Sequence, residues 1–391
     1  MPSLDDRFRL LLQARGPDLW RGIEVREPAQ VPARVRRADR LLAAVTALLL
    51  AGAGIFLGVR AFQGTRAPSR SATGPTPSGR LVGSMKVGPN GQVTSVLEAA
   101  GSVWVTAYGV PGPEDEAVIR IDPESQKVLA TIPVQGVPAW ETGGGGLAYG
   151  AGSFWVVGQA PAASGRDAVL YRIDPATNNV VATISLGGVR GADVIVDGTT
   201  VWTAFFGEES AQVARIDSRT NRIVATIPLT SDYVRRIVEV NGSVFAEEIE
   251  FSGDGVVSGT LIEAINPQTN QVIASSSPVS VSPTAGIAGW DGELWAGSDA
   301  GFTRLDPDTL KPASDLVPVP HGVCCMLFES GPEGIWFVDL NSRLILFDPR
   351  MRSANEVLDV SEEGPIATAT APNRVWLLGF DGTLSRIDLV W

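Results

Sequence analysis

The sequence predicts an all-β fold: a seven-bladed β-propeller closed by its N- and C-terminal strands and preceded by a single transmembrane α-helix. Three observations predict this architecture. A hairpin phrase recurs between residue 118 and the end of the chain, an aromatic residue recurs every 40 to 51 residues from Trp104 to Trp376, and one uncharged apolar segment precedes both. Four-stranded units of this length are typical of propeller blades.

Residues 1–40 are predicted to form a cytoplasmic tail with one short amphipathic helix. Ser3 has the sequence context of a helix start, and apolar residues then recur at helical spacing up to Gly16: Leu4, Phe8, Leu11 and Leu12. An isolated helix of this length is unstable in water, so we expect residues 4–15 to contact the membrane or a cytoplasmic protein. A loosely ordered tail is the alternative.

Residues 41–60 are predicted to form the transmembrane helix. Residues 41–59 are 19 uncharged residues, which as a helix come close to spanning a hydrocarbon layer of ~30 Å. A cleavable signal peptide is the alternative, but the 40 residues before the segment are long for its charged region. Five arginines shortly before the segment, against three shortly after it, predict a single-pass protein of the cell membrane with a cytoplasmic N-terminus and an extracytoplasmic propeller.

Residues 61–79 are predicted to be a flexible stalk rich in Pro, Ser, Thr and Gly, and residues 80–391 the propeller. Residues 60–391 carry 22 Lys and Arg against 37 Asp and Glu, whereas the whole chain has a net charge of −12. Such an acidic surface repels phosphate backbones, so we expect no nucleic-acid partner.

The recurring phrase predicts a β-hairpin in each blade. Its clearest copies are VIRIDPESQKVLATIPV, LYRIDPATNNVVATISL and VARIDSRTNRIVATIPL, at residues 118–134, 170–186 and 213–229. Asp caps a turn through its side chain, Pro sets φ at the following position, and Asn tolerates a left-handed conformation. The repeated aspartates are therefore predicted to be structural residues and not an array of metal ligands.

An aromatic strand precedes each hairpin, and the number of these strands predicts the number of blades. Their aromatic residues are predicted to pack in the blade cores: Trp104, Trp155, Trp202, Phe245, Trp295, Trp336 and Trp376. The last blade lacks a fourth strand because the chain ends at Trp391, whereas residues 80–88 match the second half of the phrase and have no first half. Pairing residues 80–88 with residues 384–389 would close the ring and leave no open edge.

The repeat I-D-P-x-T-N-x-V-V-A-T-I-x-L-G resembles that of YncE-like, or YVTN-type, seven-bladed propellers. The G-x-V-W-V strands resemble streptogramin (virginiamycin B) lyase-like propellers. The resemblance covers the chain from about residue 81 onward and implies the fold more strongly than a function, since this architecture supports many activities.

His321 is the most suggestive single residue, because Pro320-His321-Gly322 leads into a predicted innermost strand at the channel mouth. The resemblance to the lyases implies a catalytic histidine there, used with a second histidine, a glutamate and a divalent metal. The chain has 1 His, so that metal site cannot be assembled, and we expect no metal and no cofactor. Glu141 is the acidic partner that an enzyme would use, and a solvent-facing loop histidine is the alternative.

Further ligand-binding candidates occupy equivalent crossings of other blades. They are Trp140, Arg190, Tyr233 and Arg235, with Arg236 beside them, and Cys324 and Cys325 after His321. These arginines could bind a carboxylate or phosphate, or they could be rim residues paired with nearby acids. A bond between the adjacent cysteines would need a distorted peptide, and two buried thiols are the alternative.

These observations favour a membrane-anchored binding, sensing or protein-interaction module, with an extracytoplasmic ligand or protein partner that the sequence does not identify. The alternatives are a lyase-like or hydrolase-like enzyme that uses the channel mouth around His321, and a cell-envelope scaffold. No recognisable nucleophile motif is present, which favours a non-enzymatic role.

Overall fold

The computed structural model describes most of the predicted propeller: residues 77–87, 92–108, 116–137, 146–162, 165–207, 209–251, 257–276, 286–298, 300–319, 328–339, 341–360, 365–379 and 381–391. The chain divides into two compact units, Met1–Leu42 and Ala43–Trp391, and every described residue belongs to the second. The predicted helix at 4–15, the predicted transmembrane segment at 41–60 and stalk residues 61–76 lie outside the described residues. Within the described ranges, no helix is long and apolar enough to cross a membrane.

The described strands form seven four-stranded antiparallel sheets, which confirms the predicted seven blades. We number the blades one to seven in chain order of their innermost strands: β2 (Gln92–Ala99), β6 (Leu147–Gly150), β10 (Arg190–Asp197), β14 (Tyr233–Val240), β18 (Ile287–Trp290), β22 (Glu329–Gly331) and β26 (Pro365–Ala371). The second strands, in the same order, are β3 (Ser102–Tyr108), β7 (Ser153–Ala162), β11 (Thr200–Phe206), β15 (Ser243–Phe251), β19 (Glu293–Ser298), β23 (Gly334–Val338) and β27 (Arg374–Gly379). The third strands are β4 (Glu116–Ile121), β8 (Gly165–Asp174), β12 (Ala211–Asp217), β16 (Val257–Asn266), β20 (Gly301–Leu305), β24 (Arg343–Asp348) and β28 (Thr383–Val390). The outermost strands are β5 (Val128–Pro133), β9 (Asn179–Ser185), β13 (Arg222–Pro228), β17 (Gln271–Ser275), β21 (Val317–Pro318), β25 (Ser353–Asp359) and β1 (Ser78–Lys86).

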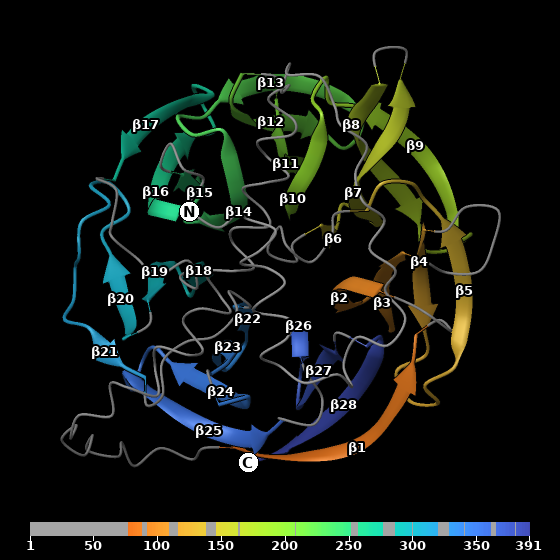
Figure 1. The fold of residues 1–391 in the computed structure, drawn as a ribbon, viewed down its shortest axis with the longest axis vertical. Helices are drawn as coiled ribbons and strands as arrows, with labels where there is room; N and C mark the ends of the chain where they lie inside the picture. The colour runs from red at the N-terminus through yellow and green to blue at the C-terminus, as the bar shows by residue number, and fades with distance from the viewer. Residues whose placement is uncertain are drawn as a thin grey trace, which may run out of the picture. The chain divides into compact units, whose positions relative to one another are not determined.

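The first and last strands close the ring. Strand β1 pairs antiparallel with β28, with Arg80 opposite Asp388 and Met85 opposite Leu384. Innermost strands of neighbouring blades contact one another all the way round, including β26 with β2 (Figure 1). The predicted closure by the two ends of the domain is therefore confirmed.

The hairpin turns have the predicted structural role. Asp122 Oδ1 accepts the backbone N–H of Ser125 at 2.7 Å, and hydrogen bonds from Ser125 lower the pKa of Asp122 below its ordinary value. In later copies Asn178, Asn221 and Asn270 occupy the left-handed region with φ of 56°, 56° and 54°. Asn tolerates that conformation better than other residues with a β-carbon, which explains its recurrence in the phrase.

The recurring tryptophans fill the spaces between blades. Trp104, Trp155, Trp202, Trp336 and Trp376 are fully buried. The Trp104 ring stacks on Phe154 of the next blade at a centroid distance of 3.9 Å. Trp104 and Trp155 each belong to a core shared with the following blade, so their strands join two sheets.

Arginines on the third strands add polar contacts across four of the seams, that is, the boundaries between neighbouring blades. We call this set the inter-blade arginines: Arg120, Arg172, Arg215 and Arg386. Arg172 of blade two lies 5.1 Å from the Trp155 ring centroid. Its Nη1 donates to the Ser218 carbonyl at 2.6 Å and to Asn221 Oδ1 at 2.9 Å, both in the turn of blade three. Arg386 of blade seven donates to the Pro123 carbonyl of blade one at 2.9 Å, so the same contact also joins the last blade to the first.

Candidate functional site: a charged cavity in the central channel

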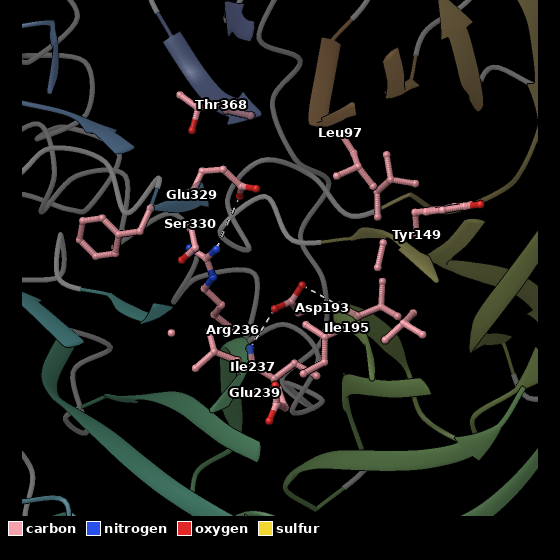
Figure 2. Close-up of a pocket in the computed structure, with 18 of the residues that line it drawn as sticks. Leu97, Tyr149, Asp193, Ile195, Arg236, Ile237, Glu239, Glu329, Ser330 and Thr368 are labelled. Atoms are coloured by element: carbon pink, nitrogen blue, oxygen red, sulfur yellow. Dashed lines mark hydrogen bonds and ion pairs between the residues drawn. The ribbon is translucent and has the colours of Figure 1, made fainter. Parts of the chain in front are cut away.

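A cavity of about 370 Å³ occupies the central channel (Figure 2). Residues of all seven innermost strands line it, from Val96 of β2 to Thr368 of β26. This volume lies within the usual range of small-molecule sites. Most of the lining residues are apolar, and the described lining residues with charged side chains are Asp193, Arg236, Glu239 and Glu329.

Three of these charged side chains, Asp193, Arg236 and Glu329, form one group, which we call the channel triad. Figure 2 shows Arg236 extending toward Glu329 with Asp193 beside it. Arg236 Nη2 lies 4.0 Å from Glu329 Oε2, which is an ion pair without a hydrogen bond. The triad joins blades three, four and six across the channel.

Asp193 is the most tightly held member of the channel triad. Only 3% of the residue is exposed. Its Oδ1 accepts the backbone N–H of Val194 at 2.8 Å, and its Oδ2 accepts the N–H of Ile237 on the neighbouring innermost strand at 2.8 Å. These bonds fix the carboxylate in one orientation and connect β10 to β14.

Both carboxyl groups of the triad titrate near neutral pH. Burial raises the pKa of Asp193 to about 7, while Arg236 and the two backbone N–H groups oppose the shift. Burial also raises the pKa of Glu329 to about 7, against the opposing charge of Arg236, and the charge of Asp193 adds to the rise. The Glu329 side chain is 31% exposed, but it lines a channel enclosed by seven strands, so it has less water around it than a surface carboxylate.

β-Bulges place Asp193 and Arg236. The register of β10 against β11 shifts between Gly191 and Asp193, and that of β14 against β15 shifts between Val234 and Arg236. At a bulge two residues face one on the partner strand, so the side chains after it change direction. The two charged residues follow equivalent shifts in adjacent blades.

The structure separates the described ligand candidates from one another. Arg236 lines the cavity, but Arg190 and Tyr233 are not among its lining residues. Tyr233 is buried, with its ring 4.9 Å from the Phe206 ring. Arg235 is 2% exposed and forms an ion pair with the buried Glu247 inside blade four.

Two further buried glutamates lie in the same blade as that ion pair. Glu248 Oε2 accepts the backbone N–H of Ser231 at 2.6 Å, while its Oε1 has no hydrogen-bond partner among the described residues. Burial raises the pKa of Glu248 to about 8, and Glu263, which is also buried, adds to the rise. Blade four therefore contains a carboxyl group whose pKa lies well above its ordinary value.

The remaining sequence candidates, Trp140, Glu141, His321, Cys324 and Cys325, lie outside the described residues. Within the described ranges, no group of three or more His, Cys, Asp or Glu side chains could hold a metal ion.

Sequence reasoning did not select Asp193, Glu239 or Glu329. A usable signal was present for Asp193 and Glu329. Asp193 interrupts the apolar middle of β10 and Glu329 begins β22, and a charged side chain on an innermost strand must face either a neighbouring blade or the channel.

Neither the family models nor the curated proteins include a match to this sequence. Among solved structures, the chain is similar to hydrazine synthase from Kuenenia stuttgartiensis, with a TM-score of 0.53 and 12% sequence identity. The match covers 78% of this chain and 97% of that chain. At this level of identity the likeness shows the propeller fold alone.

Proposed function

We propose that this protein is a ligand-binding module of the cell membrane, whose extracytoplasmic propeller takes a small molecule into its central channel. The observation that carries the proposal is the cavity that all seven innermost strands line around the channel triad. Buried charges are costly unless they are paired or serve a ligand. The resemblance of the repeat to YncE-like propellers agrees with a binding role.

The proposed location of the protein is the cell membrane, with the propeller outside. The predicted transmembrane helix at 41–60, with its uncharged run at 41–59, would anchor the chain, and the arginine bias would keep residues 1–40 in the cytoplasm. Residues 4–15 would then be available to a cytoplasmic protein, so that ligand binding outside could be reported inside. Protease treatment of intact cells tests this orientation: we expect a C-terminal tag to be cleaved and an N-terminal tag to be protected. Protection of the C-terminal tag would contradict it.

A thermal-shift screen of the full chain tests the binding function. The panel contains small amines, carboxylic acids, sugars and nucleosides. We expect at least one compound to raise the melting temperature of the wild type and to have a smaller effect on Glu329→Gln. The matched control is Asp308→Asn, which removes one charge from an exposed turn in blade five. A compound that stabilises wild type and Glu329→Gln equally does not bind at the channel triad, and a panel without any hit contradicts the function.

An enzymatic role is the second candidate, and one observation favours it. Asp193 and Glu329 have pKa values of about 7 on either side of Arg236, the range suited to general acid–base catalysis. To detect turnover, each compound that raises the melting temperature is incubated with the protein and followed by NMR. Turnover would appear as the signals of a new compound. An unchanged ligand after prolonged incubation would favour binding alone.

A further inference from the structure

The charges around the cavity are unequal. Among the described lining residues, three carboxyl groups belong to Asp193, Glu239 and Glu329, whereas Arg236 supplies the one positive charge. Glu239 Oε1 accepts the backbone N–H of Gly242, so one carboxylate oxygen of Glu239 already has a hydrogen-bond partner at the end of β14. The channel triad still contains two carboxyl groups for one guanidinium.

Arg236 is poorly placed to bind an anion. It lies beside both carboxyl groups of the triad, and its charge opposes the rise in pKa of each. An incoming carboxylate or phosphate would have to share Arg236 with Asp193 and Glu329, and it would meet their repulsion at short range. The surroundings of Arg236 therefore disfavour anions.

Glu329 is well placed to accept a hydrogen bond from a ligand. Its contact with Arg236 is 4.0 Å, longer than a hydrogen bond, and its side chain keeps 31% of its surface exposed. Asp193, by contrast, already accepts two backbone N–H groups. Glu329 is thus the carboxylate of the triad with free acceptor positions among the described contacts.

The rest of the lining suits a carbon skeleton. Val96, Leu97, Ile195 and Val238 contribute apolar surface to the cavity. Apolar surface favours an organic cation over a hydrated metal ion, because it can cover a carbon chain but offers no oxygen ligands to a metal. The described residues also contain no cluster that could hold a metal ion.

We infer that the channel cavity binds a small organic ammonium ion, with Glu329 accepting its N–H groups and the apolar strand residues covering its carbon chain. This inference rests on the proposed ligand-binding function and names the chemical class of the ligand. The unequal charge supports it, since the cation supplies the second positive charge that the triad lacks.

A matched series of three compounds tests the charge of the ligand. n-Butylammonium chloride, n-butanol and sodium butyrate have the same carbon chain with positive, neutral and negative ends. Each is titrated into the full chain at pH 8 and constant ionic strength, and binding is followed by calorimetry and by tryptophan fluorescence. We expect butylammonium to bind at least about tenfold more tightly than butanol, and butyrate to bind most weakly.

Two substitutions and a control locate the ammonium group. Glu329→Gln should weaken butylammonium binding by about tenfold, whereas Asp308→Asn in the exposed turn of blade five should leave it unchanged. Arg236→Gln should leave butylammonium binding equal or stronger, because it removes a competing cation. If Arg236→Gln fails to fold, the comparison of Glu329→Gln with Asp308→Asn still decides the question.

The outcomes separate this inference from the function on which it rests. Tighter binding of butyrate than of butylammonium, with loss of butyrate binding in Arg236→Gln, overturns the inference and leaves the channel as a binding site. Equal butylammonium binding by wild type and Glu329→Gln also overturns it. If none of the three compounds changes the heat or the fluorescence, the channel does not bind small molecules of this size and the proposed function itself is contradicted.

Discussion

Replacing Arg172 by methionine should weaken the seam between blades two and three. Methionine keeps apolar atoms over Trp155 but removes three hydrogen bonds of the guanidinium, to the Ser218 carbonyl, to Asn221 Oδ1 and to Ser153 Oγ. A hydrogen bond from a charged donor contributes about 1.5–3 kcal/mol, and the half-buried position of Arg172 places each bond near or below the lower end of that range. With the lost cation–π contact of about 0.5 kcal/mol, we expect a total destabilisation of about 3 kcal/mol.

A double-mutant cycle separates this contact from general disruption. The partner substitution is Asn221→Gly, because glycine accepts the φ of 56° at that position and removes only the side chain. The free energy of unfolding is measured by urea titration of the full chain with tryptophan fluorescence. We expect a coupling energy of about 1 kcal/mol between the two substitutions.

The exposed Arg222 on β13 provides the control. Arg222→Met removes the same charge from the same turn region and should change the stability by less than about 0.5 kcal/mol. A coupling energy between Arg172 and Asn221 within about 0.3 kcal/mol of zero would show that the hydrogen bond across the seam does not stabilise the ring.

Three further changes test other parts of the structure. Burial raises the pKa of Glu248 to about 8 from an ordinary 4.5, so the folded chain should lose stability as pH rises between these values. Glu248→Gln, which cannot ionise, should flatten that part of the stability profile, and an unchanged profile would refute the assignment. Deleting residues 77–87 removes β1 and exposes the edge of β28, so we expect aggregation on size-exclusion chromatography; a monomeric, fully stable product would show that closure is dispensable. Gly301→Ala should destabilise by about 2 kcal/mol or more, because a β-carbon there would lie 2.0 Å from the Val317 carbonyl oxygen. In Gly152→Ala, where φ is also positive but space is open, thermal denaturation should show a loss of only about 1 kcal/mol.

The blades were predictable because their signals are local and repeated. The Asp or Asn that opens most of the turns, and the tryptophan or phenylalanine in each second strand, can be recognised from neighbouring residues in the sequence. Closure was also predictable, since two incomplete halves of the phrase stand at opposite ends of the domain. These features follow from period and turn chemistry alone.

The channel triad was harder to predict because it depends on bulges. Arg235 and Arg236 are adjacent, and sequence alone gives no reason to place one inside blade four and the other in the channel. The register shift after Val234 decides between them. Asp193 follows an equivalent shift in β10, and Glu329 approaches Arg236 only because the ring brings blade six near blade four. Such neighbours are set by the whole fold and not by local spacing.

The pairing of β1 with β28 also constrains how the domain is made. During translation, β1 emerges first among the strands of the propeller, and its hydrogen-bonding partner emerges last. Blades one to six can fold as they appear, but blade seven is complete only once β28 has emerged, and β1 stays unpaired until then. A chain truncated before β28 would therefore have two unsatisfied sheet edges, on β1 and on β27, and quality-control proteases should remove it.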